Sequence, residues 1–170
     1  MNGQKMRGHP DVPTGHPKMM LVCEDEPARV EGLRFCDRLA ENGHGRVEHY
    51  RSVWQMTELA SPASQRSAVM EAASAEVVVI SVREINAVPE ALATWTNKWA
   101  RQRKEKTGFL VLLAESSALS YAKWECLLTY LRCAARLSGM DFRFVPSWEK
   151  KDVEEQGRSI GAGWAVPAEV

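Results

Sequence analysis

The chain lacks a net charge, because 22 Lys and Arg residues balance 22 Asp and Glu residues among 170 positions. It therefore has no overall electrostatic field that would attract nucleic acid or an anionic membrane surface. It also lacks long apolar runs: none approaches the roughly 20 residues that a membrane-spanning helix needs. We therefore expect neither a nucleic-acid partner nor a membrane partner.

The amino-terminal segment, residues 1–18, lacks the apolar core of roughly 7–15 residues that a signal peptide needs, which favours a cytoplasmic location. Its prolines and glycines follow no helical or strand periodicity, so we interpret it as a disordered arm. Residues 19–146 are predicted to form one α/β domain. Residues 147–170, with glycines and mixed charge, are predicted to be a C-terminal tail.

The four cysteines include no CxxC pair, so neither a zinc motif nor a redox motif is supported. Cys126 and Cys133 lie seven positions apart in a predicted helix. That spacing separates them by about 10 Å, which is too far for a disulfide. We interpret all four cysteines as small buried apolar side chains in a reducing compartment.

The segment Glu76–Pro89, with the sequence EVVVISVREINAVP, carries a short β-branched run that only Ser81 interrupts. A run of this kind is typical of a central parallel strand that is buried on both faces. We predict further strands at Met19–Cys23, Val47–Val53, Phe109–Ala114 and Met140–Val145. Helical patterns lie between them, near residues 27–42, 64–73, 89–106 and 117–137.

Strands that alternate with helices predict a parallel sheet covered on both faces, which is a three-layer α/β sandwich. Five strands suit the flavodoxin-like order 2-1-3-4-5, whose crevice opens between the carboxyl ends of strands one and three. That crevice is the predicted site. Its residues come from the two strand exits: Glu24, Asp25, Glu26, Ser81, Arg83, Glu84 and Asn86.

Three consecutive acids at the first strand exit allow two interpretations. Glu24 and Asp25 could hold Mg²⁺, which prefers carboxylate oxygens. Alternatively, the acids could complement the positive end of the following helix dipole without any cofactor. A flavin or dinucleotide phosphate is not expected here, because it favours a turn rich in glycine or hydroxyl groups rather than carboxylates.

Ser81 has no predicted catalytic base, because no histidine falls at a strand exit and no GxSxG sequence surrounds it. We therefore expect its hydroxyl to bind the backbone. The basic end of the third helix, from Lys98 to Lys106, is interpreted as a complement to that helix dipole, with a nucleic-acid site as the alternative.

The sequence VCEDEPARVEGL, at positions 22–33, resembles the opening of response-regulator receiver domains. The resemblance implies that Glu24 and Asp25 lie where receivers hold Mg²⁺ and that Ser81 replaces the phosphorylated aspartate. It also places Ala114 at the position where receivers carry a switch Ser or Thr, and Val145 at the position where they carry a lysine followed by a proline. Such a chain would be a degenerate receiver, or pseudo-receiver, and it also resembles short uncharacterised bacterial proteins.

These observations predict a non-catalytic, receiver-like domain that signals by binding another protein, without phosphotransfer and without a cofactor, or with Mg²⁺ alone. Trp95 and Trp99 are assigned to the core, whereas Trp54, Trp148 and Trp164 lie outside the predicted elements and could contact a protein partner. The alternative is a metal-assisted enzyme in which Glu24, Asp25 and Glu26 hold a metal, and Ser81, Arg83 or Asn86 contacts the substrate. The sequence leaves the oligomeric state open.

Overall fold

The computed structural model describes residues 18–42, 51–85, 87–104, 107–114 and 121–145. The predicted arm before Lys18 and the predicted tail after Pro146 lie outside the described residues, as do Trp148 and Trp164. The expectations about these segments therefore stay predictions.

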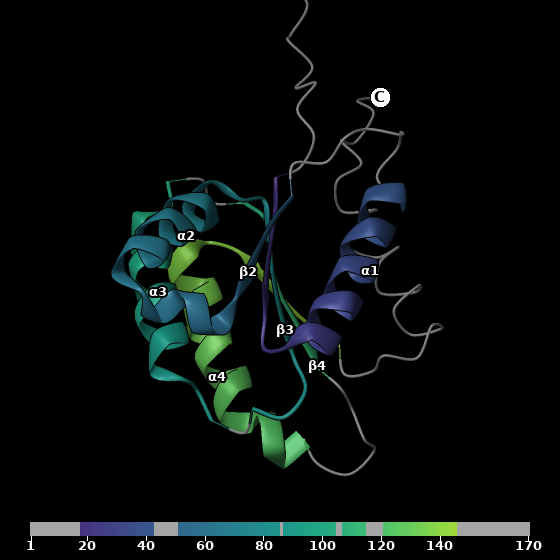
Figure 1. Cartoon of the computed structure of the whole chain (residues 1–170). Coiled ribbons are helices and arrows are strands. Elements are labelled where there is room, and N and C mark those ends of the chain that lie inside the picture. Colours follow the sequence, from purple (N-terminus) through teal and green to yellow (C-terminus); the bar gives the residue numbers. More distant parts are fainter. Residues whose placement is uncertain (1–17, 43–50, 86, 105–106, 115–120, 146–170) are drawn as a thin grey trace, which may run out of the picture.

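Five strands form one parallel sheet in the order β2-β1-β3-β4-β5, which confirms the predicted fold class. The strands are β1 (Met19–Cys23), β2 (Arg51–Gln55), β3 (Val77–Val82), β4 (Phe109–Ala114) and β5 (Asp141–Val145). The helices are α1 (Glu26–Asn42), the 3₁₀ helix η1 (Met56–Ala60), α2 (Pro62–Ser74), α3 (Glu90–Gln102) and α4 (Tyr121–Ser138). Helix α1 covers one face of the sheet, and α2, α3 and α4 cover the other (Figure 1).

Strand β3 occupies the centre of the sheet, and all six of its residues are buried. It pairs with β1 on one side and β4 on the other, so that Ser81 lies level with Cys23 and Leu113. The same register brings the carboxyl ends of β1 and β3 to one edge of the sheet. The acidic exit of β1 therefore lies beside the polar exit of β3.

The tryptophans on α3 fill the core on the three-helix face, as predicted. Trp95 and Trp99 are both fully buried, and their ring centroids lie 5.7 Å apart. Leu92, one turn earlier on the same helix, belongs to the same cluster. This spacing of i, i+3 and i+7 places one apolar stripe against the sheet.

Three element boundaries within the described residues differ from the prediction by two residues or more. Strand β2 extends to Gln55 and so includes Trp54, and η1, which was not predicted, follows it directly. Helix α2 begins at Pro62, after Ser61, rather than at Ser64, because proline suits the first helical position. Helix α3 ends at Gln102 rather than at Lys106.

The early end of α3 has a physical cause in Arg103, which is 4% exposed. Its guanidinium donates to the carbonyl oxygens of Ala72, Ala73 and Ala75 at the end of α2, and to that of Thr107. The side chain therefore serves the end of a neighbouring helix instead of its own. Sequence analysis had assigned it to the basic end of α3 itself, as a complement to that helix dipole.

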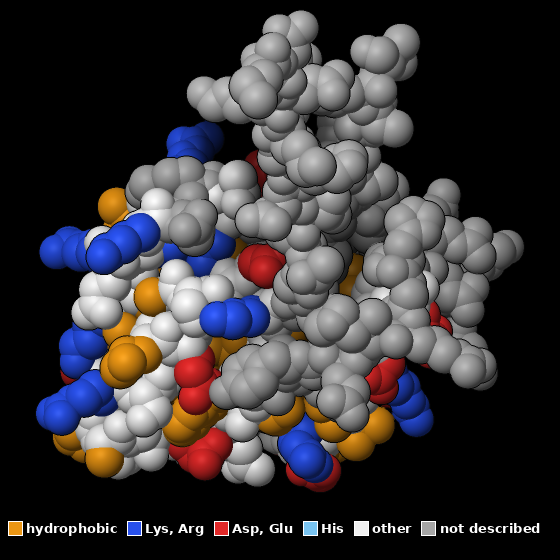
Figure 2. Space-filling model, turned by 90° about the horizontal axis from the view of Figure 1, so that it is seen from above, with side chains coloured by type: hydrophobic (Ala, Val, Ile, Leu, Met, Phe, Trp, Pro, Cys, Tyr) orange, Lys and Arg blue, Asp and Glu red, His pale blue; other side chains and the backbone are white. Residues whose placement is uncertain are grey.

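Lys and Arg side chains in the view from above lie mainly towards the α2 and α3 side, with hydrophobic side chains between them (Figure 2). No helix within the described ranges has the length and apolar character that spanning a membrane would require. The four cysteines form no disulfide, as predicted, but only Cys23 and Cys36 are buried. Cys126 and Cys133 are exposed on α4, so their predicted burial is wrong.

Candidate functional site at the carboxyl edge of β1 and β3

The exit of β1 is fixed by Asp25, which caps α1. Its Oδ1 accepts the backbone N–H of Ala28 at 2.7 Å, and its carbonyl oxygen accepts the N–H of Arg29 at 2.9 Å. Pro27, between these residues, has no N–H to offer. In the first turn of α1, Pro27 therefore has no amide hydrogen, and the amide hydrogens of Ala28 and Arg29 are both bound to Asp25.

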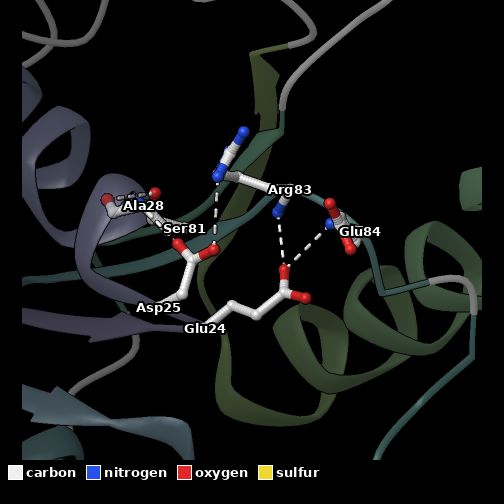
Figure 3. Close-up of polar contacts among 6 residues, drawn as sticks. All are labelled: Glu24, Asp25, Ala28, Ser81, Arg83 and Glu84. Atoms are coloured by element: carbon white, nitrogen blue, oxygen red, sulfur yellow. Dashed lines mark hydrogen bonds and ion pairs between the residues drawn. The ribbon is translucent and has the colours of Figure 1, made fainter.

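Glu24 joins the exit of β1 to the exit of β3. Its backbone N–H donates to the carbonyl oxygen of Ser81 at 3.0 Å, which continues the strand pairing. Its carboxylate oxygen Oε2 accepts the backbone N–H of Arg83 at 2.6 Å and that of Glu84 at 3.0 Å (Figure 3). One carboxylate thus holds the turn that leaves β3.

Ser81 points away from the crevice. It is fully buried, and its hydroxyl donates to the carbonyl oxygen of Ala28 at 2.8 Å (Figure 3). This bond confirms the predicted backbone role and leaves the hydroxyl without access to a substrate. Ala28 was not singled out by sequence analysis, although a small residue after a proline at a helix start permits this close approach of α1 to β3.

Arg83 and Asp25 form the ion pair of the site, at 3.4 Å, with side chains that are 30% and 39% exposed. A pair this exposed contributes about 1 kcal/mol or less to stability. Glu26 turns outward instead and pairs with Arg29 of its own helix at 2.7 Å. Asn86 lies outside the described residues.

The structure thus brings together Glu24, Asp25, Ser81, Arg83 and Glu84, five of the seven predicted residues. Glu26 lies at the rim, and Asn86 cannot be placed. Apart from the cap that Asp25 places on Ala28, the side-chain bonds of this cluster join the β1–α1 segment to β3 and its exit, so the cluster closes the edge of the sheet.

The cluster contains several carboxylates but does not have the arrangement of a metal site. Within the described ranges, no group of three or more His, Cys, Asp or Glu side chains is arranged to hold a metal ion. The carboxylates of Glu24 and Asp25 accept amide hydrogens and an Arg instead. A metal ion held by Asp25 and by Glu24 Oε2 would have to displace those donors, at the cost of leaving backbone N–H groups unsatisfied.

Cys23, the last residue of β1, is a buried neighbour of the cluster. Burial raises the pKa of its thiol to about 11, although the positive charge of Arg29 opposes the shift. Its Sγ donates to the carbonyl oxygen of Trp54 at 3.3 Å. The thiol is therefore protonated at neutral pH and is not a nucleophile for the crevice.

A cavity of about 360 Å³ lies at the opposite end of the sheet, beside the start of β1. Its lining includes Lys18 and Met20 from the β1 segment, Ser52 from β2, and Met70 and Glu71 from α2. It shares no residue with the polar cluster, so the two features are separate.

No protein-family model matches the chain, and no curated protein sequence matches it. Solved structures match its fold. An NADH:FMN oxidoreductase in its apo form superposes with a TM-score of 0.59 at 10% identity, over 86% of this chain and 87% of that one. An NAD(P)H:quinone oxidoreductase from Methanothermobacter marburgensis gives 0.50 at 11% identity, over 92% and 100% of the two chains. An azoreductase from Bacillus anthracis gives 0.49 at 11% identity, over 86% and 95%.

The matches to the NADH:FMN oxidoreductase and the NAD(P)H:quinone oxidoreductase correct the family inferred from the sequence. They are flavodoxin-like oxidoreductases and not response-regulator receivers, so the receiver assignment is wrong. The prediction of a non-catalytic, protein-binding receiver-like domain is wrong with it. The geometry gives the physical reason: Glu24, Asp25 and Ser81 bind the backbone of the two strand exits, whereas a receiver would turn these positions towards a phosphoryl group.

The expectation about cofactors is corrected as well. No cofactor, or Mg²⁺ alone, was predicted, and a flavin was rejected at this loop. That expectation does not hold against neighbours that include an NADH:FMN oxidoreductase.

Proposed function

We propose that this chain is an oxidoreductase of the flavodoxin-like kind, which takes the ring system of a flavin at the carboxyl edge of its sheet. The observation that carries the proposal is the sheet order 2-1-3-4-5, whose switch point lies between β1 and β3. Ligands of open parallel sheets bind outside the carboxyl ends of the strands at such a point, and FMN does so in this strand order. The similarity to an NADH:FMN oxidoreductase over 86% of the chain supports the same choice.

The residues present do not fit the phosphate of FMN at the start of α1. A helix start that binds phosphate offers free amide hydrogens and small or hydroxyl side chains. Here Pro27 has no amide hydrogen, and Asp25 already accepts that of Ala28. The adjacent carboxylates of Glu24 and Asp25 would also repel a phosphate. The proposal therefore concerns the flavin ring system and not a phosphate anchor.

The part of the chain that faces the proposed ring site is the exit of β3. Glu24 fixes this exit through the amide hydrogens of Arg83 and Glu84. Ile85 and Val88, just beyond, are only partly buried, and they pack against the core cluster. Partly exposed apolar side chains on a fixed turn offer a surface of the kind that lines small-molecule sites.

Titration of the purified chain with riboflavin and with FMN tests the proposal. We expect saturable quenching of flavin fluorescence by at least one of them, and NADH oxidation that depends on both flavin and protein. The titration should extend to about 100 µM, where a site worth only about −5.5 kcal/mol is half filled. No saturable change for either flavin would refute the proposal.

The cellular location of the chain and its macromolecular partners are also matters of proposal. We propose a cytoplasmic location. We also propose that any macromolecular partner is a protein rather than nucleic acid or a membrane. Trp54, one of the tryptophans considered for such a contact, is partly buried against the core, and its indole N–H donates to Glu71 at 2.8 Å.

A further inference from the structure

We propose that Glu24 and Asp25 are specificity-determining residues that exclude phosphate from the β1/β3 switch point, so that the flavin taken there is one without a phosphate, of the riboflavin type. This inference rests on the proposed function, because it specifies the chemical class of the ligand. It comes from four contacts that engage groups which a phosphate would otherwise use.

The first contact is at the start of α1. A phosphate bound to a helix start accepts the amide hydrogens of its first turn. In this chain the N–H of Ala28 is held by Asp25 at 2.7 Å, and Pro27 has none. The capping carboxylate thus occupies part of the place that a bound anion would take.

The second and third contacts are at the exit of β3. The amide hydrogens of Arg83 and Glu84 converge on one oxygen of Glu24, at 2.6 and 3.0 Å. Two successive N–H groups that converge in this way form an anion-binding concavity. Its anion is supplied by the chain itself.

The fourth contact concerns the cation of the site. Arg83 could pair with a phosphate, but its guanidinium lies 3.4 Å from Asp25 Oδ2. Ser81, the hydroxyl at the end of β3, donates inward to Ala28 and is fully buried. An incoming phosphate would therefore meet two carboxylates, and the N–H groups and the guanidinium that bind them would already be engaged. A ligand without a phosphate meets no such repulsion.

Charge repulsion sets the expected size of the effect. One unit charge about 5 Å from another in a water-like dielectric changes a dissociation constant about fourfold. A phosphate that carries nearly two charges should therefore lose at least about tenfold in binding affinity when it lies beside two carboxylates. We expect the wild-type chain to bind riboflavin at least about tenfold more tightly than FMN.

The variants Glu24→Gln and Asp25→Asn test which residues cause this preference. Both keep an oxygen that accepts the same amide hydrogens, and asparagine caps helices about as well as aspartate. Each should lower the ratio of the FMN to the riboflavin dissociation constant at least about fivefold. Glu41→Gln is the matched control, because it removes the same charge from the far end of α1, roughly 22 Å away. Its ratio should stay within about twofold of wild type.

Inorganic phosphate gives a readout that does not depend on flavin. Phosphate should raise the melting temperature of a Glu24→Gln, Asp25→Asn double variant more than that of wild type. Binding of FMN as tight as that of riboflavin by the wild-type chain would overturn the inference while leaving the proposed function intact. Equal ratios in all variants would also overturn it. Failure of both flavins to bind wild type would instead overturn the proposed function, and this inference with it.

Discussion

Replacing Arg103 with methionine should destabilise the fold strongly, although sequence analysis interpreted the residue only as part of the basic end of its own helix. The guanidinium is buried between the end of α2 and the segment that enters β4. It donates closely to the carbonyl oxygens of Ala75 and Thr107, and at 3.4 Å to those of Ala72 and Ala73. A cation at this place also complements the negative end of the α2 dipole.

The magnitude follows from the acceptors that would lose their donor. Methionine has a similar length, so Arg103→Met leaves little cavity, but it leaves the two close carbonyl oxygens without a hydrogen bond. A buried acceptor left unsatisfied, such as the Ala75 carbonyl, costs about 1–3 kcal/mol, and the part-buried Thr107 carbonyl should cost about 1 kcal/mol. We therefore expect a loss of about 3–4 kcal/mol in the free energy of unfolding. Arg103→Lys should recover part of it, because one ammonium cannot reach all four carbonyls in a fixed fork.

Urea unfolding followed by tryptophan fluorescence measures this loss. With a slope near 2 kcal/mol per molar, the midpoint should fall by about 1.5–2 M at unchanged slope. Arg101→Met is the matched control, since Arg101 is exposed on the last turn of α3. It should change stability by about 0.5 kcal/mol or less. A midpoint for Arg103→Met that matches this control would refute the role of Arg103 as the cap of α2.

Two further predictions concern a glycine and the cysteines. Gly108 has a φ of 126°, and a Cβ added there would lie against the carbonyl oxygen of Glu76, so Gly108→Ala should cost more than about 2 kcal/mol of stability. Gly139 has a φ of 73°, and Gly139→Ala should cost only about 1 kcal/mol. Similar losses for the two variants in thermal unfolding would contradict this difference. Cys126 and Cys133 should react with a thiol reagent in the native state at pH 8, whereas Cys23 should not, because its pKa is raised from 9.0 to about 11. The stability that depends on the Cys23 thiol is fully present below pH 9 and should be lost as the pH rises through about 11. Cys23→Ala should abolish this pH dependence. The same loss of stability in the Cys23→Ala variant would contradict the role of the thiol.

The fold could be predicted because it depends on patterns that are local in the sequence. The buried runs at Met19–Cys23 and Phe109–Ala114 have no polar interruption, so their bounds match the structure residue for residue. The α3 stripe of Leu92, Trp95 and Trp99 has helical spacing, so its buried face was also evident. The end of α3 was not predictable, because Arg103 turns inward to carbonyl groups about 30 positions earlier.

For the site, too, the location followed from the sequence, whereas the role of each side chain depends on contacts that only the structure shows. The strand order placed Glu24, Asp25 and Ser81 at one edge, and the structure confirms that placement. The backbone role of Ser81 was predictable, but the role of the acids stayed open between a helix start and a metal site, because a capping carboxylate and a metal-binding carboxylate have the same sequence. Only the bonds from Ala28, Arg83 and Glu84 distinguish the two roles.

Ser81→Asp separates these roles experimentally. Ser81 is fully buried, and its hydroxyl is a donor to the carbonyl oxygen of Ala28. An ionised aspartate there would face that carbonyl without a hydrogen to donate, and a buried charge left unpaired costs about 3 kcal/mol or more. The aspartate should therefore stay protonated in the folded state, with its pKa raised above the unfolded value. The loss of stability relative to Ser81→Ala should be smallest below about pH 4, where the acid is protonated in both states, and should grow as the pH rises from there to the folded pKa. Ser81→Ala, which loses about 1–2 kcal/mol at every pH, is the control.

Mg²⁺ should not rescue the Ser81→Asp variant, because Glu24 and Asp25 are held by amide hydrogens. A melting temperature that rises with Mg²⁺ in Ser81→Asp, but not in Ser81→Ala, would show that the three side chains converge on a metal and would refute this account of the edge.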